Sequence, residues 1–177
     1  MKKLLFVLIF AMFSLNLLAV KPADTPVFIK EFQGQVDFIK GRLIQLAEAI
    51  PEDKYNWSPA EEVRTVGEVY THTADANYYF LSLITGDKSG MNQEKSVMDK
   101  KAILEKLGKS FDVVKESAGN LTEEDLNKEI EAFGMKFSAR NFMITLLNHC
   151  HEHLGQAIAY ARMNGVTPPW SMQEAGG

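Results

Sequence analysis

SARNFMITLLNHCHEHLGQAIAYARMNG, residues 138–165, has the beginning, the periodicity and the end of one long helix. Ser138 is a good N-cap, because its hydroxyl can accept a hydrogen bond from a backbone N–H of the first turn. Asn164-Gly165 is a common helix end, and Pro168-Pro169 prevents continuation. Apolar side chains recur on one face: Leu147, Cys150, Leu154, Ala157, Ile158 and Ala161. The segment therefore predicts an amphipathic helix from Ala139 to about Met163.

Two histidines lie four residues apart in this helix. His149 and His153 share one face, one turn apart, at the border between the apolar stripe and solvent. Two imidazoles in this arrangement can chelate one divalent metal. The alternative is that each is a hydrogen-bonded border residue without a ligand role. His151 points away and is interpreted as a surface residue, whereas Gln156, one turn beyond His153, is a candidate second-shell or substrate-binding group.

A third histidine lies on another predicted helix, from about Thr65 to Ile84. His72 sits at the edge of that helix's apolar stripe and would complete a set of three ligands. Three protein ligands leave a coordination position for water or substrate, which is typical of a catalytic site. Zn, Ni or Fe would accept such ligands. Asp75 and Tyr79, on the same side as His72, are candidate proton-handling groups, with ordinary surface polarity as the alternative.

The remaining chain predicts two further long helices and no strand. The first helix is expected to begin at Thr25-Pro26, with Thr25 as N-cap, and to end before Pro51. The third is expected over about Met98 to Ala118. Thr122 should cap a short helical turn. Gly134 to Phe137 is expected to be a break, either irregular or briefly extended, and Ser171 to Gly177 a loosely held tail. Four long amphipathic helices predict an all-α four-helix bundle.

The N-terminus has the pattern of a secretory signal peptide. Lys2 and Lys3 precede an apolar run from Leu4 to Leu18, and Ala19 is a suitable residue for cleavage after it. An uncleaved N-terminal anchor is the alternative. We expect residues 1–19 to be a signal peptide, residues 20–177 to form one domain, and the protein to be exported, either periplasmic or secreted.

Charge and cysteine content exclude some classes of function. The formal net charge is −4 at pH 7, and no basic cluster is present, so nucleic-acid binding is not expected. The single Cys150 cannot form an internal disulfide and is expected to be a buried apolar residue rather than a nucleophile. The expected partner is a small-molecule substrate, without membrane association once the signal peptide is removed.

Four motifs together resemble the DinB/YfiT-like family of four-helix metal-binding proteins. They are RTVGEVYTH at 64–72, HCHEHLGQ at 149–156, YNWSP at 55–59 and GVTPPW at 165–170. The resemblance covers about Phe28 to Trp170. It implies an up-down-down-up bundle, often dimeric, in which His72, His149 and His153 bind one divalent metal.

The resemblance restricts the chemistry only loosely, because family members include thiol-dependent transferases and an isomerase. Low-molecular-weight thiols are a cytosolic resource, whereas an exported protein meets an oxidising environment. We therefore rank a metal-dependent hydrolase of unknown substrate first. The alternatives are a thiol-dependent S-transferase and a non-catalytic metal-binding or stress module.

Overall fold

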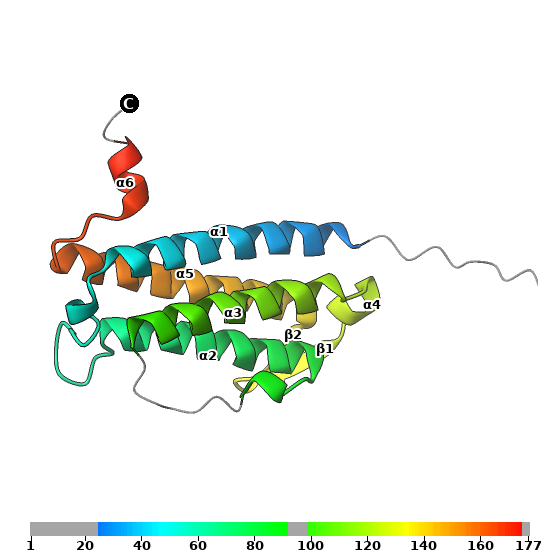
Figure 1. The fold of residues 1–177 in the computed structure, drawn as a ribbon. Coiled ribbons are helices and arrows are strands. Elements are labelled where there is room, and N and C mark those ends of the chain that lie inside the picture. The colour runs from blue at the N-terminus through cyan, green and yellow to red at the C-terminus, as the bar shows by residue number, and fades with distance from the viewer. Residues whose placement is uncertain (1–24, 92–98, 175–177) are drawn as a thin grey trace, which may run out of the picture.

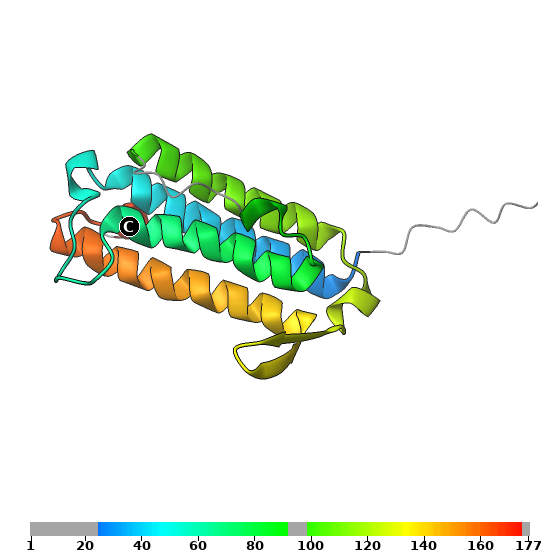
Figure 2. The same ribbon diagram turned by 90° about the horizontal axis from the view of Figure 1, so that it is seen from below.

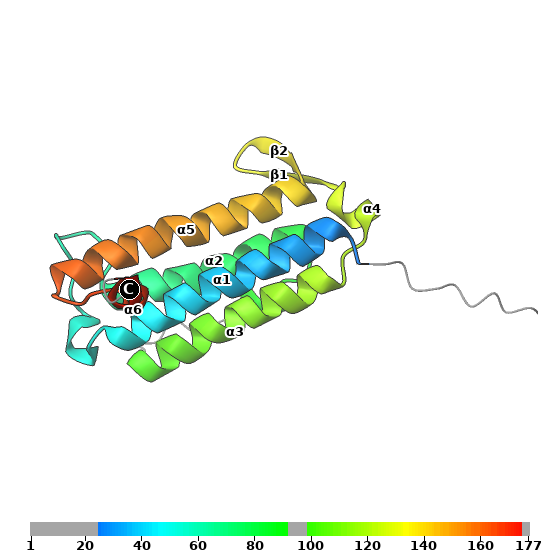
Figure 3. The same cartoon turned by 90° about the horizontal axis from the view of Figure 1, so that it is seen from above.

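Four long helices form an up-down-down-up bundle (Figure 1). The computed structural model describes residues 25–91 and 99–174, so the expected signal peptide lies outside the described residues. The long helices are α1 (Val27–Ala49), α2 (Val66–Thr85), α3 (Lys100–Gly119) and α5 (Ala139–Met163). α1 and α2 each pack against both α3 and α5, so α1 and α2 lie diagonally opposite (Figure 3). α2 and α3 run opposite to α1 and α5, which confirms the predicted bundle class.

The apolar stripes of the four helices meet in one core. The fully buried side chains of largest volume are Tyr70, Phe111, Phe142, Ile29, Ile39, Leu43, Leu46, Ile50, Leu107, Leu126, Met143 and Leu146. They come from every long helix and from the segments that connect them, and their burial supplies the main favourable term in folding. Among the described residues no helix has the length and apolar character needed to cross a bilayer.

Side-chain caps set where α2 and α5 begin, and hence which residues face the core. Thr65 Oγ1 accepts a hydrogen bond from the Glu68 backbone N–H, and Glu68 Oε2 accepts one from the Thr65 backbone N–H. This reciprocal pair is a capping box. Ser138 caps α5 by accepting from the backbone N–H of Asn141, as predicted. The two helices that carry the histidines thus begin at defined residues.

The start predicted for α1 was wrong. Pro26, not Thr25, is the N-cap residue, and no side chain caps this helix. Pro26 has an extended ψ of 142°, so the helical backbone begins only at Val27, and the Pro26 carbonyl accepts from the N–H of Ile29 and of Lys30. α3 begins at Lys100 because the Asp99 side chain caps it, slightly later than the sequence indicated.

A β-hairpin occupies the segment where no strand was expected. β1 (Glu129–Ala132) pairs antiparallel with β2 (Met135–Ser138), and Phe133 and Gly134 form the turn between them. Both turn residues have positive φ, 54° and 72°, which suits a two-residue hairpin turn. Only four residues alternate between exposed and buried in β1, too few for a clear period-2 signal. Before the hairpin, α4 (Glu123–Leu126) is capped by Thr122 as predicted.

Three short helical segments complete the described chain: η1 (Glu52–Lys54), η2 (Ser89–Met91) and α6 (Pro169–Glu174). The prediction of a loosely held tail was wrong for residues 171–174, because α6 extends through residue 174. The guanidinium of Arg42 lies 4.4 Å from the centroid of the Trp170 ring and holds α6 against α1.

Candidate metal centre

Three histidine side chains converge between α2 and α5. His72 extends from α2, and His149 and His153 extend from successive turns of α5. Nε2 of His149 lies 3.2 Å from Nε2 of His72 and 3.1 Å from Nε2 of His153. One ring nitrogen of each residue lies within 4.8 Å of the other two. The fold thus brings together the three residues that the sequence selected, from two distant parts of the chain.

The spacing of the three nitrogens fits a shared metal ion. Two imidazole nitrogens on one tetrahedral zinc would lie about 3.3 Å apart, given a Zn–N distance of about 2.0–2.1 Å. The two Nε2–Nε2 distances from His149, 3.2 Å to His72 and 3.1 Å to His153, are close to that value. Imidazole is also a good ligand for nickel and iron. The donor set therefore fits one divalent transition metal, with a coordination position left over.

A chain of polar and aromatic contacts supports His153 from behind. Its Nδ1 donates to Gln156 Oε1 over 2.9 Å, and Gln156 Nε2 donates to the Tyr160 hydroxyl over 3.0 Å. The Tyr160 ring then meets the Trp57 ring edge-on, at 5.4 Å between centroids. Because an amide oxygen only accepts hydrogen bonds, the proton of His153 is on Nδ1 and the lone pair of Nε2 faces the other histidines.

The segment that carries Trp57 also positions the start of α2. The backbone N–H of Val66 donates to the Trp57 carbonyl over 3.0 Å, and that of Gly67 donates to the Tyr55 carbonyl over 2.9 Å. A Cβ at Gly67 would lie 3.1 Å from Ile103 Cδ1 and 3.3 Å from the Tyr55 carbonyl oxygen. Glycine suits this close approach, because a Cβ would force Ile103 or the Tyr55 carbonyl to shift, and α2 begins here about one and a half turns before His72.

Electrostatics keep two of the rings neutral. Burial, followed by the nearby His153, His72 and Arg64, lowers the pKa of His149 to about 4. Burial, then Arg64 and His153, lowers the pKa of His72, against the opposing effect of Asp75. Nδ1 of His149 is buried without a partner among the described residues, so a protonated ring would lack an acceptor. Neutral imidazoles are the form that binds metals.

Asp75 and Tyr79 lie outside the cluster formed by the three histidines. The Asp75 carboxylate forms a salt bridge with Lys106 of α3, at 2.6 Å. Its negative charge still affects the site, because it opposes the lowering of the His72 pKa that burial and Arg64 cause. The Tyr79 side chain is 38% exposed and its ring lies 6.4 Å from that of Phe133, between centroids.

Phe80 contacts the site and was not among the site residues selected from the sequence. Its ring lies 5.3 Å from the His149 ring, between centroids, at an interplanar angle of 65°. Arg64, beside the Thr65 cap, was likewise quoted only as part of a motif. Arg64 immediately precedes the Thr65 N-cap of α2. No local signal in the sequence indicates that its charge lowers the pKa of two histidines on different helices.

Two further residues of α5, Cys150 and His151, are separate from the histidine cluster. Cys150 Sγ donates to the Asn77 side-chain oxygen over 3.2 Å, and burial raises the pKa of this thiol to about 12. Cys150 is therefore a buried, unreactive group, as predicted. His151 is exposed, and its Nδ1 lies 2.9 Å from the Leu147 carbonyl oxygen.

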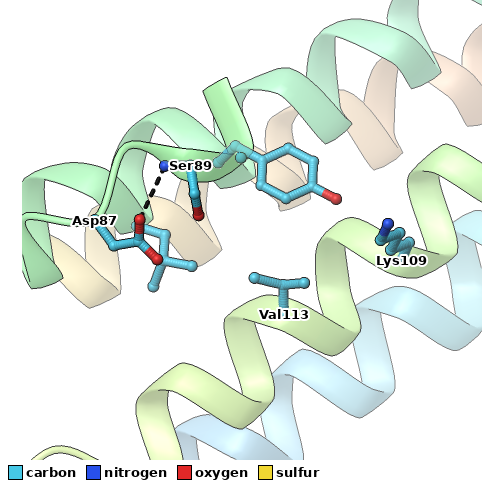
Figure 4. A pocket seen from close by; sticks show the side chains of 7 residues that line it. Asp87, Ser89, Lys109 and Val113 are labelled. Atoms are coloured by element: carbon cyan, nitrogen blue, oxygen red, sulfur yellow. Dashed lines mark hydrogen bonds between the residues drawn. The ribbon is translucent and has the colours of Figure 1, made fainter. Parts of the chain in front are cut away.

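A cavity of about 230 Å³ lies elsewhere, between α2, η2 and α3. Figure 4 shows Asp87 and Ser89 on one side of it and Lys109 and Val113 on α3. Asp87 Oδ1 accepts from the Ser89 backbone N–H over 2.9 Å. No histidine lines this cavity, which is therefore separate from the histidine cluster between α2 and α5.

Comparisons with known proteins identify the family and the fold of this chain. The sequence profile of the DinB family matches residues 27–174. YjoA, an uncharacterized protein of Bacillus subtilis, is 29% identical over 127 residues, which are 70% of this chain and 82% of YjoA. The crystal structure of this DinB-like protein superposes with a TM-score of 0.66 and 25% identity, covering 77% of this chain and 93% of YjoA.

Two further solved structures share the fold. A DinB-like protein from Bacillus cereus has a TM-score of 0.66 at 22% identity, over 80% of this chain and 95% of its own. YfiT from Bacillus subtilis has a TM-score of 0.64 at 16% identity, over 83% of this chain and 94% of its own. YfiT is described as a probable metal-dependent hydrolase with an unusual four-helix bundle topology.

Proposed function

Because this chain belongs to the DinB family, we propose that His72, His149 and His153 bind one divalent transition metal and that the site hydrolyses a small-molecule substrate. The observation that carries the proposal is the convergence of three imidazole nitrogens within 4.8 Å of one another. Nε2 of His149 can donate its one proton to only one of its two histidine neighbours at a time, whereas a shared cation would accept a lone pair from all three rings. The description of YfiT as a probable metal-dependent hydrolase supports the same class of reaction.

The protein's own residues prepare this site for a cation and a substrate. The lowered pKa values of His72 and His149 keep both rings unprotonated at neutral pH. Gln156 holds the His153 ring with its Nε2 lone pair toward the site. When bound, a divalent ion with three neutral ligands supplies Lewis acidity, which polarises a carbonyl or lowers the pKa of water.

Asp75 and Tyr79 are our proposed proton-handling groups, and two conservative variants test them. The Asp75 carboxylate would stabilise positive charge at the site, or would release its salt bridge to Lys106 and accept a proton from the substrate. Tyr79 would act through its hydroxyl, which is accessible on a half-exposed side chain. Asp75→Asn and Tyr79→Phe should each lower kcat by at least about tenfold if these groups transfer protons. An unchanged kcat removes that residue from the reaction.

We also propose that the protein is exported, on the evidence of the Lys2-Lys3 pair and the apolar run that follows it. Export favours hydrolysis over thiol transfer, because cytosolic thiol cosubstrates are scarce outside the cell. The buried Cys150 offers no nucleophile of its own for a thiol-based reaction.

The experiment combines metal analysis with a turnover assay on the mature protein. Wild type should hold about one divalent metal per chain and hydrolyse members of an ester and amide panel without added thiol. His153→Ala should lose most of the metal and the activity, whereas His151→Ala, altered two residues earlier on the exposed face, should retain both. Activity only with added thiol would replace hydrolysis by thiol transfer. Metal retained in His153→Ala would contradict the ligand assignment.

A further inference from the structure

Phe133 has two properties that folding alone does not favour. It occupies the first position of the hairpin turn with a φ of 54°, where asparagine or glycine is preferred and a bulky side chain is a genuine outlier. Its side chain is also 61% exposed, although it is a large hydrophobic group. Backbone strain of this kind persists where the surroundings enforce it and clusters at ligand-binding sites.

The ring of Phe133 continues a row of aromatic side chains that ends at a metal ligand. Its centroid lies 6.2 Å from that of Phe142, 6.5 Å from Phe80 and 6.4 Å from Tyr79. Phe80 in turn lies 5.3 Å from the His149 ring. Figure 2 shows the hairpin beside the beginning of α5, and β1 also contacts α2. A row of aromatic rings therefore runs from His149 to the hairpin turn, and its exposed members are Tyr79 and Phe133.

We propose that the exposed rings of Phe133 and Tyr79 bind an apolar, preferably aromatic, group of the substrate whose polar end lies at the three histidines. This inference rests on the function proposed above and names the substrate class. Phe80 and Phe142 are buried and support the surface from beneath, whereas Tyr79 and Phe133 remain 38% and 61% exposed and can accept a ligand. Aromatic groups at centroid separations of about 4.5–7 Å attract one another beyond simple burial of area.

A small molecule suits this surface better than a second protein chain. A stable protein interface buries about 800 Å² per partner, far more than two half-exposed rings can offer. The exposed rings also lie close to the three histidines, because the buried Phe80 ring beneath them touches the His149 ring at 5.3 Å between centroids. A second copy of this chain remains an outcome that the experiment distinguishes.

Two metal-binding probes test the inference through binding rather than turnover. Acetohydroxamate and benzohydroxamate share the same chelating group and differ in a methyl or a phenyl substituent. Calorimetry on the metal-loaded protein should give benzohydroxamate about tenfold tighter binding or more, because the phenyl ring gains the aromatic contacts. The ratio of the two affinities is the readout, after metal content has been measured in the same sample.

Phe133→Asn is the decisive variant, because asparagine suits the left-handed turn conformation and should preserve the hairpin. The affinity ratio should fall close to one, while metal content stays at the wild-type level. Tyr79→Ala, a helical position that tolerates alanine, should lower the ratio independently. Phe38→Ala is the matched control, since Phe38 is 51% exposed on α1, diagonally across the bundle.

Each result separates this inference from the proposed function. A wild-type protein without metal overturns the proposed function itself. A metal-loaded wild type with a ratio near one overturns only the aromatic surface, as does a ratio unchanged in both Phe133→Asn and Tyr79→Ala. If Phe133→Asn converts a dimer to a monomer in sedimentation while the ratio is kept, the surface is an interface between copies. If Phe133→Asn fails to fold, the ratio measured for Tyr79→Ala decides.

Discussion

Gln156 Oε1 and His153 Nδ1 lie 2.9 Å apart, one turn along the same face of α5. The amide oxygen accepts the ring proton and so orients the opposite nitrogen, Nε2, toward His149 at 3.1 Å. Gln156 is itself held by its hydrogen bond to the Tyr160 hydroxyl. The lone pair of His153 that faces the other two histidines is therefore oriented by residues outside the histidine cluster.

Replacing Gln156 by leucine should weaken metal binding by about 10–100-fold, because a ligand histidine loses the partner that fixes its tautomer and orientation. The affinity is measured by competition with a chelator of known affinity. Gln156→Glu should weaken binding less, since a carboxylate accepts the same proton. Equal affinities for wild type and Gln156→Leu would show that the hydrogen bond does not position the ligand.

Acid should destabilise the metal-free protein through His149. The folded-state pKa of about 4 lies below the value of about 6.5 in an unfolded chain. Between these values the unfolded chain binds more protons, so stability is unaffected above pH 6.5 and falls as the pH decreases toward 4. Urea midpoints at pH about 7.5 and about 5 should drop less for His149→Gln than for wild type. A drop of equal size in both proteins would contradict this pKa shift.

The Cys150 thiol should react slowly in the folded protein. It is completely buried, and its pKa of about 12 leaves almost no thiolate at neutral pH. A chromogenic disulfide reagent should titrate about one thiol per chain in denaturant and react many times more slowly in native buffer. Rapid native reaction would mean that the packing around α5 opens readily.

Two glycine substitutions should change stability in opposite directions. Gly34→Ala should stabilise the protein by about 0.5–1 kcal/mol, because alanine favours the helix and its Cβ would meet no atom within 4 Å. Gly67→Ala should be destabilising, since the new Cβ would crowd the Tyr55 carbonyl oxygen and Ile103. Thermal unfolding of both variants measures the difference. A stable Gly67→Ala protein with full metal content would show that the start of α2 can shift without cost to the site.

Cleavage after Ala19 is the expected fate of the N-terminal segment. N-terminal sequencing of protein recovered from the native cell envelope or medium should begin at Val20. Recovery of intact Met1 from the cytosol would contradict both export and the argument that ranks hydrolysis above thiol transfer.

Local patterns in the sequence were sufficient for the four long helices and for selecting the three histidines that the fold brings together. The spacing of His149 and His153 places both on one face of α5 because a helix turns about 100° per residue. The caps at Thr65, Thr122 and Ser138 could be read in the same way, since a cap involves only neighbouring residues. Thr25 was the exception, because an extended Pro26 delays the helix by one residue.

Tertiary structure alone decided which side chains meet. Three contacts join segments far apart in the chain: His72 with His149, the salt bridge of Asp75 with Lys106, and the edge-to-face packing of Phe133 on Phe80. Periodicity tells which face of a helix is buried, but the register between two packed helices depends on side chains from both. The hairpin was missed for the same reason, because four alternating residues acquire strand structure only when they pair with a partner strand and pack against α2 and α5.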